Sequence, residues 1–176
     1  VSGTITIKKL LFSGMSSLFA IFTDNRLYRS DDNGGSWQVC SSPPSIEVPQ
    51  FLFHKGKVFR ATRISPGLQI STDLGNSWTT IPGLPVDTRT NQFSIYLQGI
   101  SSITADEEAL FITTGRGVFR SADGGGTWEQ LSHQDVRFTT LFKARASLLA
   151  YANEGIFRHV PAEQHWKLLP AFYFGT

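Results

Sequence analysis

Residues 121–128 read Ser-Ala-Asp-Gly-Gly-Gly-Thr-Trp, and two earlier stretches, residues 30–37 and 71–78, follow the same pattern. All three fit Ser-x-Asp-x-Gly-x-(Ser/Thr)-Trp, which we call the box. Successive boxes begin 41 and 50 positions apart. A period of this length predicts a repeat protein, in which each repeat forms one supersecondary unit that packs against its neighbours.

The box side chains are predicted to be structural. Asp, Ser and Thr side chains hydrogen-bond the backbone of a tight turn, Gly accepts conformations that other residues avoid, and Trp packs into the core. A fourth copy, residues 159–166, keeps only the Trp. The positions assigned to the structural role are Ser30, Asp32, Gly34, Ser36, Trp37, Ser71, Asp73, Gly75, Ser77, Trp78, Ser121, Asp123, Gly125, Thr127, Trp128 and Trp166.

The sequence around each box predicts four short strands. A strand, tight turn and strand precede each box, one short strand follows it, and another apolar stretch comes before the hairpin. The unit therefore has the size of a propeller blade. The predicted repeats, in a single domain covering residues 1–176, are residues 4–40, 48–81, 93–131 and 136–169, followed by a C-terminal strand at 170–176.

The box resembles the Asp-box, also called the bacterial neuraminidase repeat or BNR repeat, and the resemblance covers essentially the whole chain. It implies an all-β fold, a β-propeller of four four-stranded blades with the box at the turn between the third and fourth strands. The chain is then either a closed four-blade ring or part of a larger propeller. Self-association that completes a ring is a further alternative.

Composition argues against several classes of partner and cofactor. The formal net charge is +2, and the basic residues are scattered, so no nucleic-acid partner is expected. The apolar stretch at 10–22 is too short to span a membrane. The four histidines lack the spacing of metal ligands, and no acidic residue stands where a calcium loop requires one. We therefore expect no metal, no cofactor and no transmembrane segment.

Enzymatic activity is the alternative function. Sialidases carry an Arg-Ile-Pro motif near the start of a six-bladed ring, which residues 63–66 (Arg-Ile-Ser-Pro) match imperfectly. Xyloglucan-degrading hydrolases with Asp-boxes need a carboxylate pair. Acidic residues lie outside the boxes here, but the Asp-Ile-Gly-Gly type of motif is absent. No residue is assigned a catalytic role, and an enzyme fragment of either type remains the alternative.

Three arginines share one repeat position. Arg29, Arg120 and Arg158 each come directly before the box or its remnant, and Ile70 takes that position in the second repeat. Guanidinium groups repeated in this way could form a basic rim for an anionic or protein partner. Alternatively, each Arg stacks on the Trp of its blade or pairs with a neighbouring acid.

Asp-box propellers outside the enzymes include the photosystem II stability and assembly factor-like proteins and the sortilin-type receptors, and the chain resembles the first more closely than the second. The similarity lies in residues 117–121 (Gly-Val-Phe-Arg-Ser), a pattern that often flanks boxes in such repeats. It implies a noncatalytic binding or scaffold propeller, located outside the cytoplasm. We expect it to recognise a protein or carbohydrate partner through its loops or its channel face.

Overall fold

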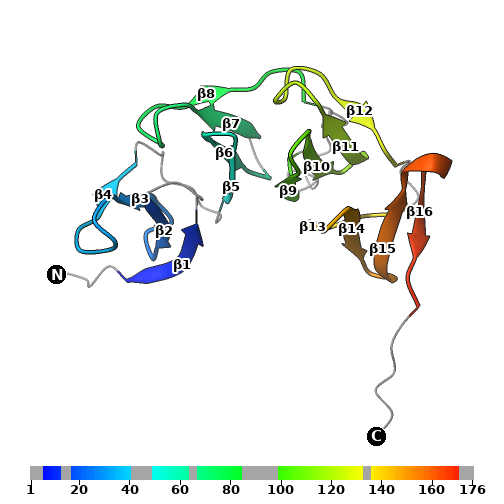
Figure 1. Cartoon of the computed structure of the whole chain (residues 1–176), viewed down its shortest axis with the longest axis horizontal. Coiled ribbons are helices and arrows are strands. Elements are labelled where there is room, and N and C mark those ends of the chain that lie inside the picture. Colours follow the sequence, from blue (N-terminus) through cyan, green and yellow to red (C-terminus); the bar gives the residue numbers. More distant parts are fainter. Residues whose placement is uncertain are drawn as a thin grey trace, which may run out of the picture. The chain divides into compact units, whose positions relative to one another are not determined.

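The computed structural model describes residues 6–12, 17–40, 49–63, 67–84, 99–132 and 136–170. Its strands form four four-stranded antiparallel sheets, which we call blades 1 to 4 (Figure 1). The chain divides into two compact units. Unit 1 comprises Val1–Thr62 and Pro66–Ile81 and holds blades 1 and 2, while unit 2 comprises Arg63–Ser65 and Pro82–Thr176 and holds blades 3 and 4.

In unit 1, the strands of each blade pair in sequence order. Blade 1 consists of β1 (Ile7–Phe12), β2 (Leu18–Phe22), β3 (Leu27–Ser30) and β4 (Gln38–Val39). Blade 2 consists of β5 (Gln50–His54), β6 (Lys57–Ala61), β7 (Leu68–Ser71) and β8 (Thr79–Thr80).

Unit 2 repeats this meander. Blade 3 consists of β9 (Ser102–Ala105), β10 (Leu110–Thr114), β11 (Gly117–Ser121) and β12 (Glu129–Gln130). Blade 4 consists of β13 (Thr140–Ala144), β14 (Ser147–Ala152), β15 (Gly155–Val160) and β16 (His165–Leu168), with a 3-10 turn, η2 (Pro161–Glu163), before β16.

Blades 1 and 2 pack face to face within unit 1. Side chains alternate between the two faces of a strand, so Phe19 and Ile21 of β2 lie on one face of blade 1 with Leu27 of β3. These three are buried in a core cluster that also contains Val58 of β6, against which Trp78 packs. The Phe19 and Phe53 rings are 4.5 Å apart across this core. Burial of apolar faces between neighbouring sheets is what holds such a unit together.

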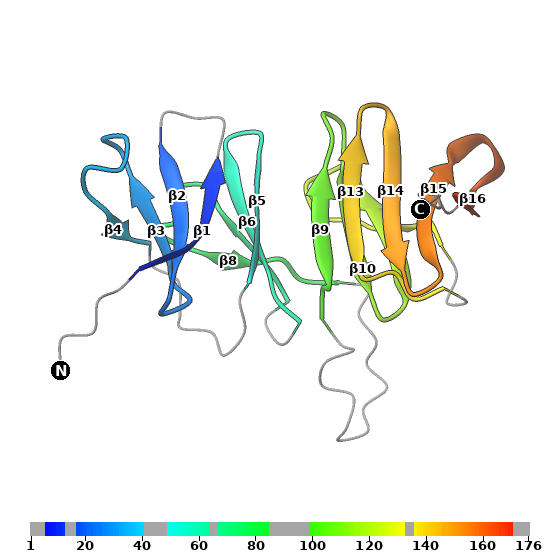
Figure 2. The same ribbon diagram turned by 90° about the horizontal axis from the view of Figure 1, so that it is seen from below.

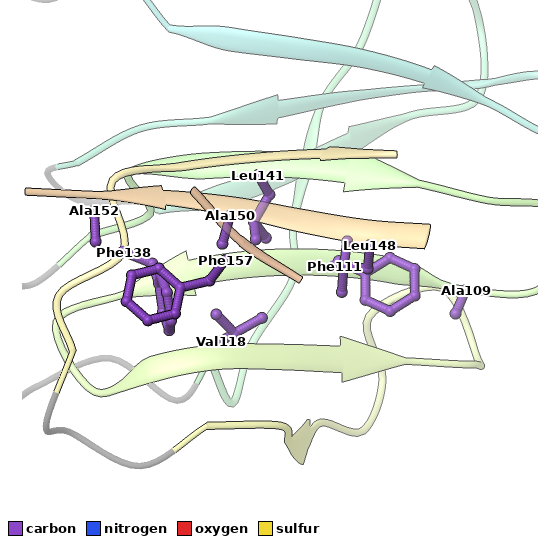
Figure 3. Packing of buried hydrophobic residues seen from close by; sticks show 9 residues of the cluster. All are labelled: Ala109, Phe111, Val118, Phe138, Leu141, Leu148, Ala150, Ala152 and Phe157. Carbon is purple, nitrogen blue, oxygen red and sulfur yellow. The ribbon is translucent and has the colours of Figure 1, made fainter. Parts of the chain in front are cut away.

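Blades 3 and 4 pack in the same way within unit 2. Phe111 and Val118 of blade 3 share a core cluster with Leu148, Ala150 and Phe157 of blade 4 (Figure 3). β9 lies beside β13 (Figure 2). The two blades are further joined by a hydrogen bond of 2.9 Å from the Leu141 backbone N–H to Ser102 Oγ.

Two sequence predictions fall partly outside the described residues. The predicted C-terminal strand lies almost wholly at 171–176, which are not described. The apolar stretch predicted to open the third repeat begins at 93, but residues 93–98 are also not described, and the strand found in the described part begins only at Ser102. The described part of the chain contains no helix with the length and hydrophobicity of a membrane span.

Candidate functional site

Each intact box closes its turn with the same set of hydrogen bonds. In the second box, the Ser77 backbone N–H donates to Asp73 Oδ1 (2.8 Å) and the Ser77 hydroxyl donates to Asp73 Oδ2 (2.6 Å). Ser71 Oγ donates to Asp73 Oδ1 (2.8 Å) and accepts from the Gly75 N–H (2.7 Å). The carboxylate thus ties together the two strands, β7 and β8, that flank the turn.

The first and third boxes repeat this arrangement. Asp32 accepts from the backbone N–H and hydroxyl of Ser36, and Asp123 accepts from the same groups of Thr127. Hydrogen bonds from Ser36 and Ser77 lower the pKa values of Asp32 and Asp73 to about 2, and those from Thr127 lower the pKa of Asp123. Such bonds favour the ionised carboxylate, so the box acids are charged at neutral pH.

The second box docks onto blade 1. Arg29 Nη1 and Cys40 Sγ both donate to the Leu74 carbonyl of the box loop, at 3.5 and 3.7 Å. Burial raises the pKa of the Cys40 thiol to about 11. A Cβ atom at Gly75 would lie 2.9 Å from Cys40 Sγ, so only glycine fits at this contact. The box loop therefore fills the space between the two blades.

The fourth repeat has a different loop at this position. Pro161 replaces the box Asp and Glu163 replaces the box Gly, and the segment forms the turn η2. Trp166 keeps its place: its Nε1 donates to the Leu131 carbonyl of unit 2 at 3.0 Å, and its ring lies 4.8 Å from that of Phe138. The blade is still anchored by its Trp, but the box hydrogen bonds are lost.

A pocket of about 480 Å³ lies between blades 3 and 4 at this loop. Arg120 and Leu131, which hold the repeat positions of Arg29 and Cys40, line it, together with Pro161 and Gln164 of the degenerate box. In unit 1, an intact box loop contacts Arg29 and Cys40 instead. The pocket thus occupies the place that the box loop takes in the other unit.

One wall of the pocket contains a partly buried ion pair. Lys143 Nζ lies 2.9 Å from Asp106 Oδ2 and 5.6 Å from the centre of the Phe111 ring. Burial by itself would raise the pKa of Asp106, but hydrogen bonds from Lys143 and from the Glu108 and Ala109 backbone N–H groups outweigh it and lower the pKa. The Asp106 carboxylate is therefore ionised and forms its ion pair with Lys143.

The charged groups of the opposite wall form a longer ion pair. Arg120 Nη1 lies 3.8 Å from Glu129 Oε2, and the Glu129 side chain is mostly exposed. Glu108 also lines the pocket and has no ion-pair partner among the described residues. Burial, followed by the nearby His165, lowers the pKa of His159, so the imidazole is neutral at neutral pH. The lining thus carries three carboxylates and two cations.

The three repeated arginines have different surroundings. Arg29 pairs with Asp31 (3.1 Å) and reaches the second box, while Arg120 pairs with Glu129 and lines the pocket. Arg158 is exposed and has no side-chain partner among the described residues. Arg29 belongs to unit 1, whereas Arg120 and Arg158 belong to unit 2. A basic rim formed by the three arginines stays a prediction.

The sequence analysis did not identify Lys143 and Asp106 as pocket residues. Asp106 lies in a run of acids that is typical of a solvated turn, and Lys143 is one of the scattered basic residues. They come together only because β9 and β13 belong to adjacent blades. Among the described residues, no group of three or more His, Cys, Asp or Glu side chains is placed to hold a metal ion.

Four-stranded antiparallel meanders that pack face to face are the blades of a β-propeller. The chain has an all-β propeller fold with four such blades, and the fold class predicted from the repeats is confirmed.

Three solved structures illustrate the likeness. An ancestral GH74 enzyme matches with a TM-score of 0.64 and 16% identity over 94% of this chain and 24% of that one. The extracellular domain of BT4673 from B. thetaiotaomicron matches with a TM-score of 0.67 and 13% identity over 94% and 22%. YCF48 bound to D1 peptide matches with a TM-score of 0.59 and 13% identity over 93% and 52%. The chain therefore spans between about a quarter and about half of these structures.

No protein-family model and no curated protein sequence matches the chain. The similar structures include both an enzyme and a protein bound to a peptide. Their likeness defines the fold.

Proposed function

We propose that the protein is a noncatalytic binding propeller that recognises a polypeptide through the pocket between blades 3 and 4. The observation that carries this proposal is the pocket itself, which replaces the box loop found at the same place in unit 1. Its volume of about 480 Å³ is in the range of ligand sites, and its walls combine an apolar ring with charged groups. The similar fold of YCF48, solved with a D1 peptide, supports a peptide as the ligand class.

The charges of the pocket favour a basic side chain in that peptide. Lys143 and Asp106 neutralise each other, and Arg120 is offset by Glu129, which leaves the Glu108 carboxylate without an ion-pair partner among the described residues. Glu108 is exposed at the pocket, and its carboxylate is best matched by a guanidinium, which can donate two parallel hydrogen bonds. We therefore infer that an arginine of the partner binds at Glu108, with its stem against the apolar part of the wall.

The proposal is tested with fluorescein-labelled hexapeptides that carry one arginine, one glutamate or neither. Fluorescence anisotropy should show binding of the arginine peptides alone. Glu108→Gln removes the charge and should weaken that binding by about tenfold, which equals about 1.4 kcal/mol, as expected for one charge-assisted hydrogen bond. Glu107→Gln is the matched control, because Glu107 is exposed like Glu108 but does not line the pocket.

Equal binding of all three peptides, or equal losses in Glu108→Gln and Glu107→Gln, would contradict the proposal. So would the release of reducing sugar from a panel of plant and bacterial glycans, because a noncatalytic propeller predicts none. If a glycan binds without being cleaved and competes with the arginine peptide, the partner is a carbohydrate and not a polypeptide.

We further propose that the intact boxes are Asp-boxes with a purely structural role and that the protein acts outside the cytoplasm. The first proposal is supported by the hydrogen bonds that occupy both carboxylate oxygens of each box Asp. The second is supported by the extracellular domain among the similar structures. Protease accessibility of the protein in intact cells of its source tests the location.

A further inference from the structure

A second pocket, of about 160 Å³, lies in unit 2 at the ends of three strands. Among its lining residues, Ser101 comes directly before β9, Thr114 ends β10 and Thr139 comes directly before β13. The pocket of the proposed function lies at the other ends of these strands, where Asp106 follows β9 and Glu108 stands just before β10. β9 and β13 lie side by side (Figure 2), and the five residues of β10 span about 15 Å. The two pockets are therefore separate sites.

The charged residues that line this second pocket are cations. Arg63 and Arg137 line it, and no Asp or Glu of the described part of the chain does. The pocket at the degenerate box, by contrast, is lined by three carboxylates and two cations. Two positive charges at one pocket, without a carboxylate in its described lining, favour an anionic ligand.

Arg137 stands on a firmly held piece of backbone. Its neighbour Phe138 is 3% exposed, and the Phe138 ring lies 4.8 Å from that of Trp166. The backbone N–H of Thr139 donates to the Tyr151 carbonyl at 2.9 Å. Arg137 itself is exposed and forms no ion pair with a described residue. A ligand therefore has to order only its side chain, which keeps the entropic cost of binding low.

Two glycines shape the other side of the pocket. Gly99 packs directly on the backbone of Arg63, and a Cβ atom at Gly99 would overlap that backbone, so only glycine fits there. Gly115 also lines the pocket. Neither glycine has a side chain that would fill the space, so a compact ligand can approach the backbone closely.

The remaining polar groups of the lining are hydroxyls that take part in hydrogen bonds within the unit. Ser101 Oγ lies 2.6 Å from Thr113 Oγ1, and Thr114 Oγ1 accepts from the Arg116 backbone N–H at 3.1 Å. These hydroxyls carry no formal charge. The two guanidinium groups therefore dominate the electrostatics of the pocket.

From its charge and size we propose that this second pocket binds a tetrahedral oxyanion with two negative charges, a phosphate or sulfate group. A volume of about 160 Å³ is below the several hundred Å³ typical of sites for whole small molecules, but it holds one such group. Two guanidinium groups match a dianion in charge, and each can donate two parallel hydrogen bonds to its oxygens. The site goes beyond the proposed function and does not depend on it, because the two pockets share no described lining residue.

Titration of the isotope-labelled full chain with sulfate, methyl phosphate or acetate, followed by NMR at constant ionic strength, tests the proposal. Sulfate and methyl phosphate should shift the amide signals of Gly99, Gly115 and Thr139 until they saturate. Acetate, which carries one charge, should bind at least about tenfold more weakly, because it forms fewer charge-assisted hydrogen bonds.

Variants of the two arginines test the assignment of the site. Arg137→Gln and Arg63→Gln should each weaken sulfate binding by about tenfold or more, whereas Arg137→Lys keeps the charge and should lose less. Arg116→Gln is the matched control, because Arg116 is an exposed arginine beside Gly115 that does not line the pocket. Both pocket arginines are exposed, so the variants should fold, and the dispersion of their NMR spectra shows whether they do.

The pH dependence of the two probes tests the charge of the ligand. Methyl phosphate gains its second charge near about pH 6, whereas sulfate is a dianion throughout. The affinity for methyl phosphate relative to sulfate should therefore rise about tenfold between about pH 5 and about pH 7.5. The probe that binds more tightly at the higher pH shows whether phosphate or sulfate groups are the preferred form.

Four results would each overturn the proposal. These are the absence of saturable shifts with both dianions, acetate binding as tight as that of sulfate, a ratio of affinities that does not change with pH, and equal losses in Arg116→Gln and the pocket variants. None of them bears on the arginine peptide, whose binding is measured at Glu108, so the two proposals fail independently.

Discussion

Blades 2 and 4 meet their preceding blades in different ways. The box loop of blade 2 sits on Arg29 and Cys40 and leaves no room beside Gly75. The loop of blade 4 has lost the box, and the matching residues Arg120 and Leu131 line a pocket. The two contacts share the same apolar packing but differ in the loop above it. An intact box thus closes the gap between blades, and its loss opens a site without loosening the core.

The largest expected effect on stability comes from the apolar cores that both pairs of blades share. Phe19→Ala in unit 1 and Phe157→Ala in unit 2 each remove a buried ring and should each lower the free energy of unfolding by about 3 to 5 kcal/mol. Urea denaturation followed by circular dichroism measures both, with Glu154→Ala in an exposed turn as control. A loss below about 1 kcal/mol at either ring would mean that the two cores are not equivalent.

Gly75→Ala tests the closed contact. The substitution forces alanine to a φ of 89° and brings its Cβ against Cys40, so we expect a loss of about 1 to 3 kcal/mol. Gly34→Ala has a similar φ of 94° but open space, and should lose only the conformational part, about 1 kcal/mol. Thermal unfolding of the two variants side by side measures the difference, and equal losses would show that the second box is not clamped by blade 1.

Restoring the fourth box tests the open contact. The combined change His159→Ser, Pro161→Asp, Glu163→Gly and His165→Ser recreates the box side chains, and the new loop should fill the pocket. Binding of the arginine peptide should then fall about tenfold or more, equal to about 1.4 kcal/mol. Asp73→Ala, which disrupts a box far from the pocket in sequence, should leave the peptide affinity unchanged. Unaltered binding to the restored variant would show that the degenerate loop does not make the site.

The smallest effect is a difference in acid response. Because the pKa of His159 is lowered in the folded state, the unfolded chain binds the proton more readily. The neutral His159 side chain therefore stabilises the folded state fully above about pH 6.5, and this stabilisation is lost as the pH falls. The ionised Asp32 and Asp73 carboxylates stabilise the folded state at pH values above 3.8, the usual pKa of Asp. This stabilisation is lost as the pH falls towards their folded-state pKa of about 2. Hydrogen exchange should therefore show weaker protection of β14 and β15 in mild acid and of β3 and β7 only in stronger acid. His159→Gln should abolish the first change.

The sequence predicted the blades well because their signals are local. Each box places its Ser, Asp and Ser or Thr within eight consecutive residues, and the side-chain hydrogen bonds that Asp73 accepts come only from that stretch. Strand alternation around the turns is equally short in range. These features depend on nearest neighbours along the chain, so a pattern search identifies them.

The pocket could not be predicted because its walls come from different blades. Lys143 and Asp106 are 37 positions apart and meet only through the packing of β13 beside β9. The loss of the fourth box was visible in the sequence. That this loss leaves a pocket depended on which residues of blade 3 face the degenerate loop, and the sequence did not show these. A degenerate repeat in an otherwise regular array is a signal that sequence reasoning could use to find such sites.

The outermost strands β4, β8 and β12 have only two residues each. Strands of this length have too few free backbone N–H and C=O groups to pair with an added strand. Their edges therefore do not nucleate amyloid-like aggregation. β16, with four residues, is the longest of these edges. Among the edges formed by the last strand of each blade, the β16 edge of blade 4 is therefore where strand addition should occur most readily, and a proline placed in β16 should reduce it.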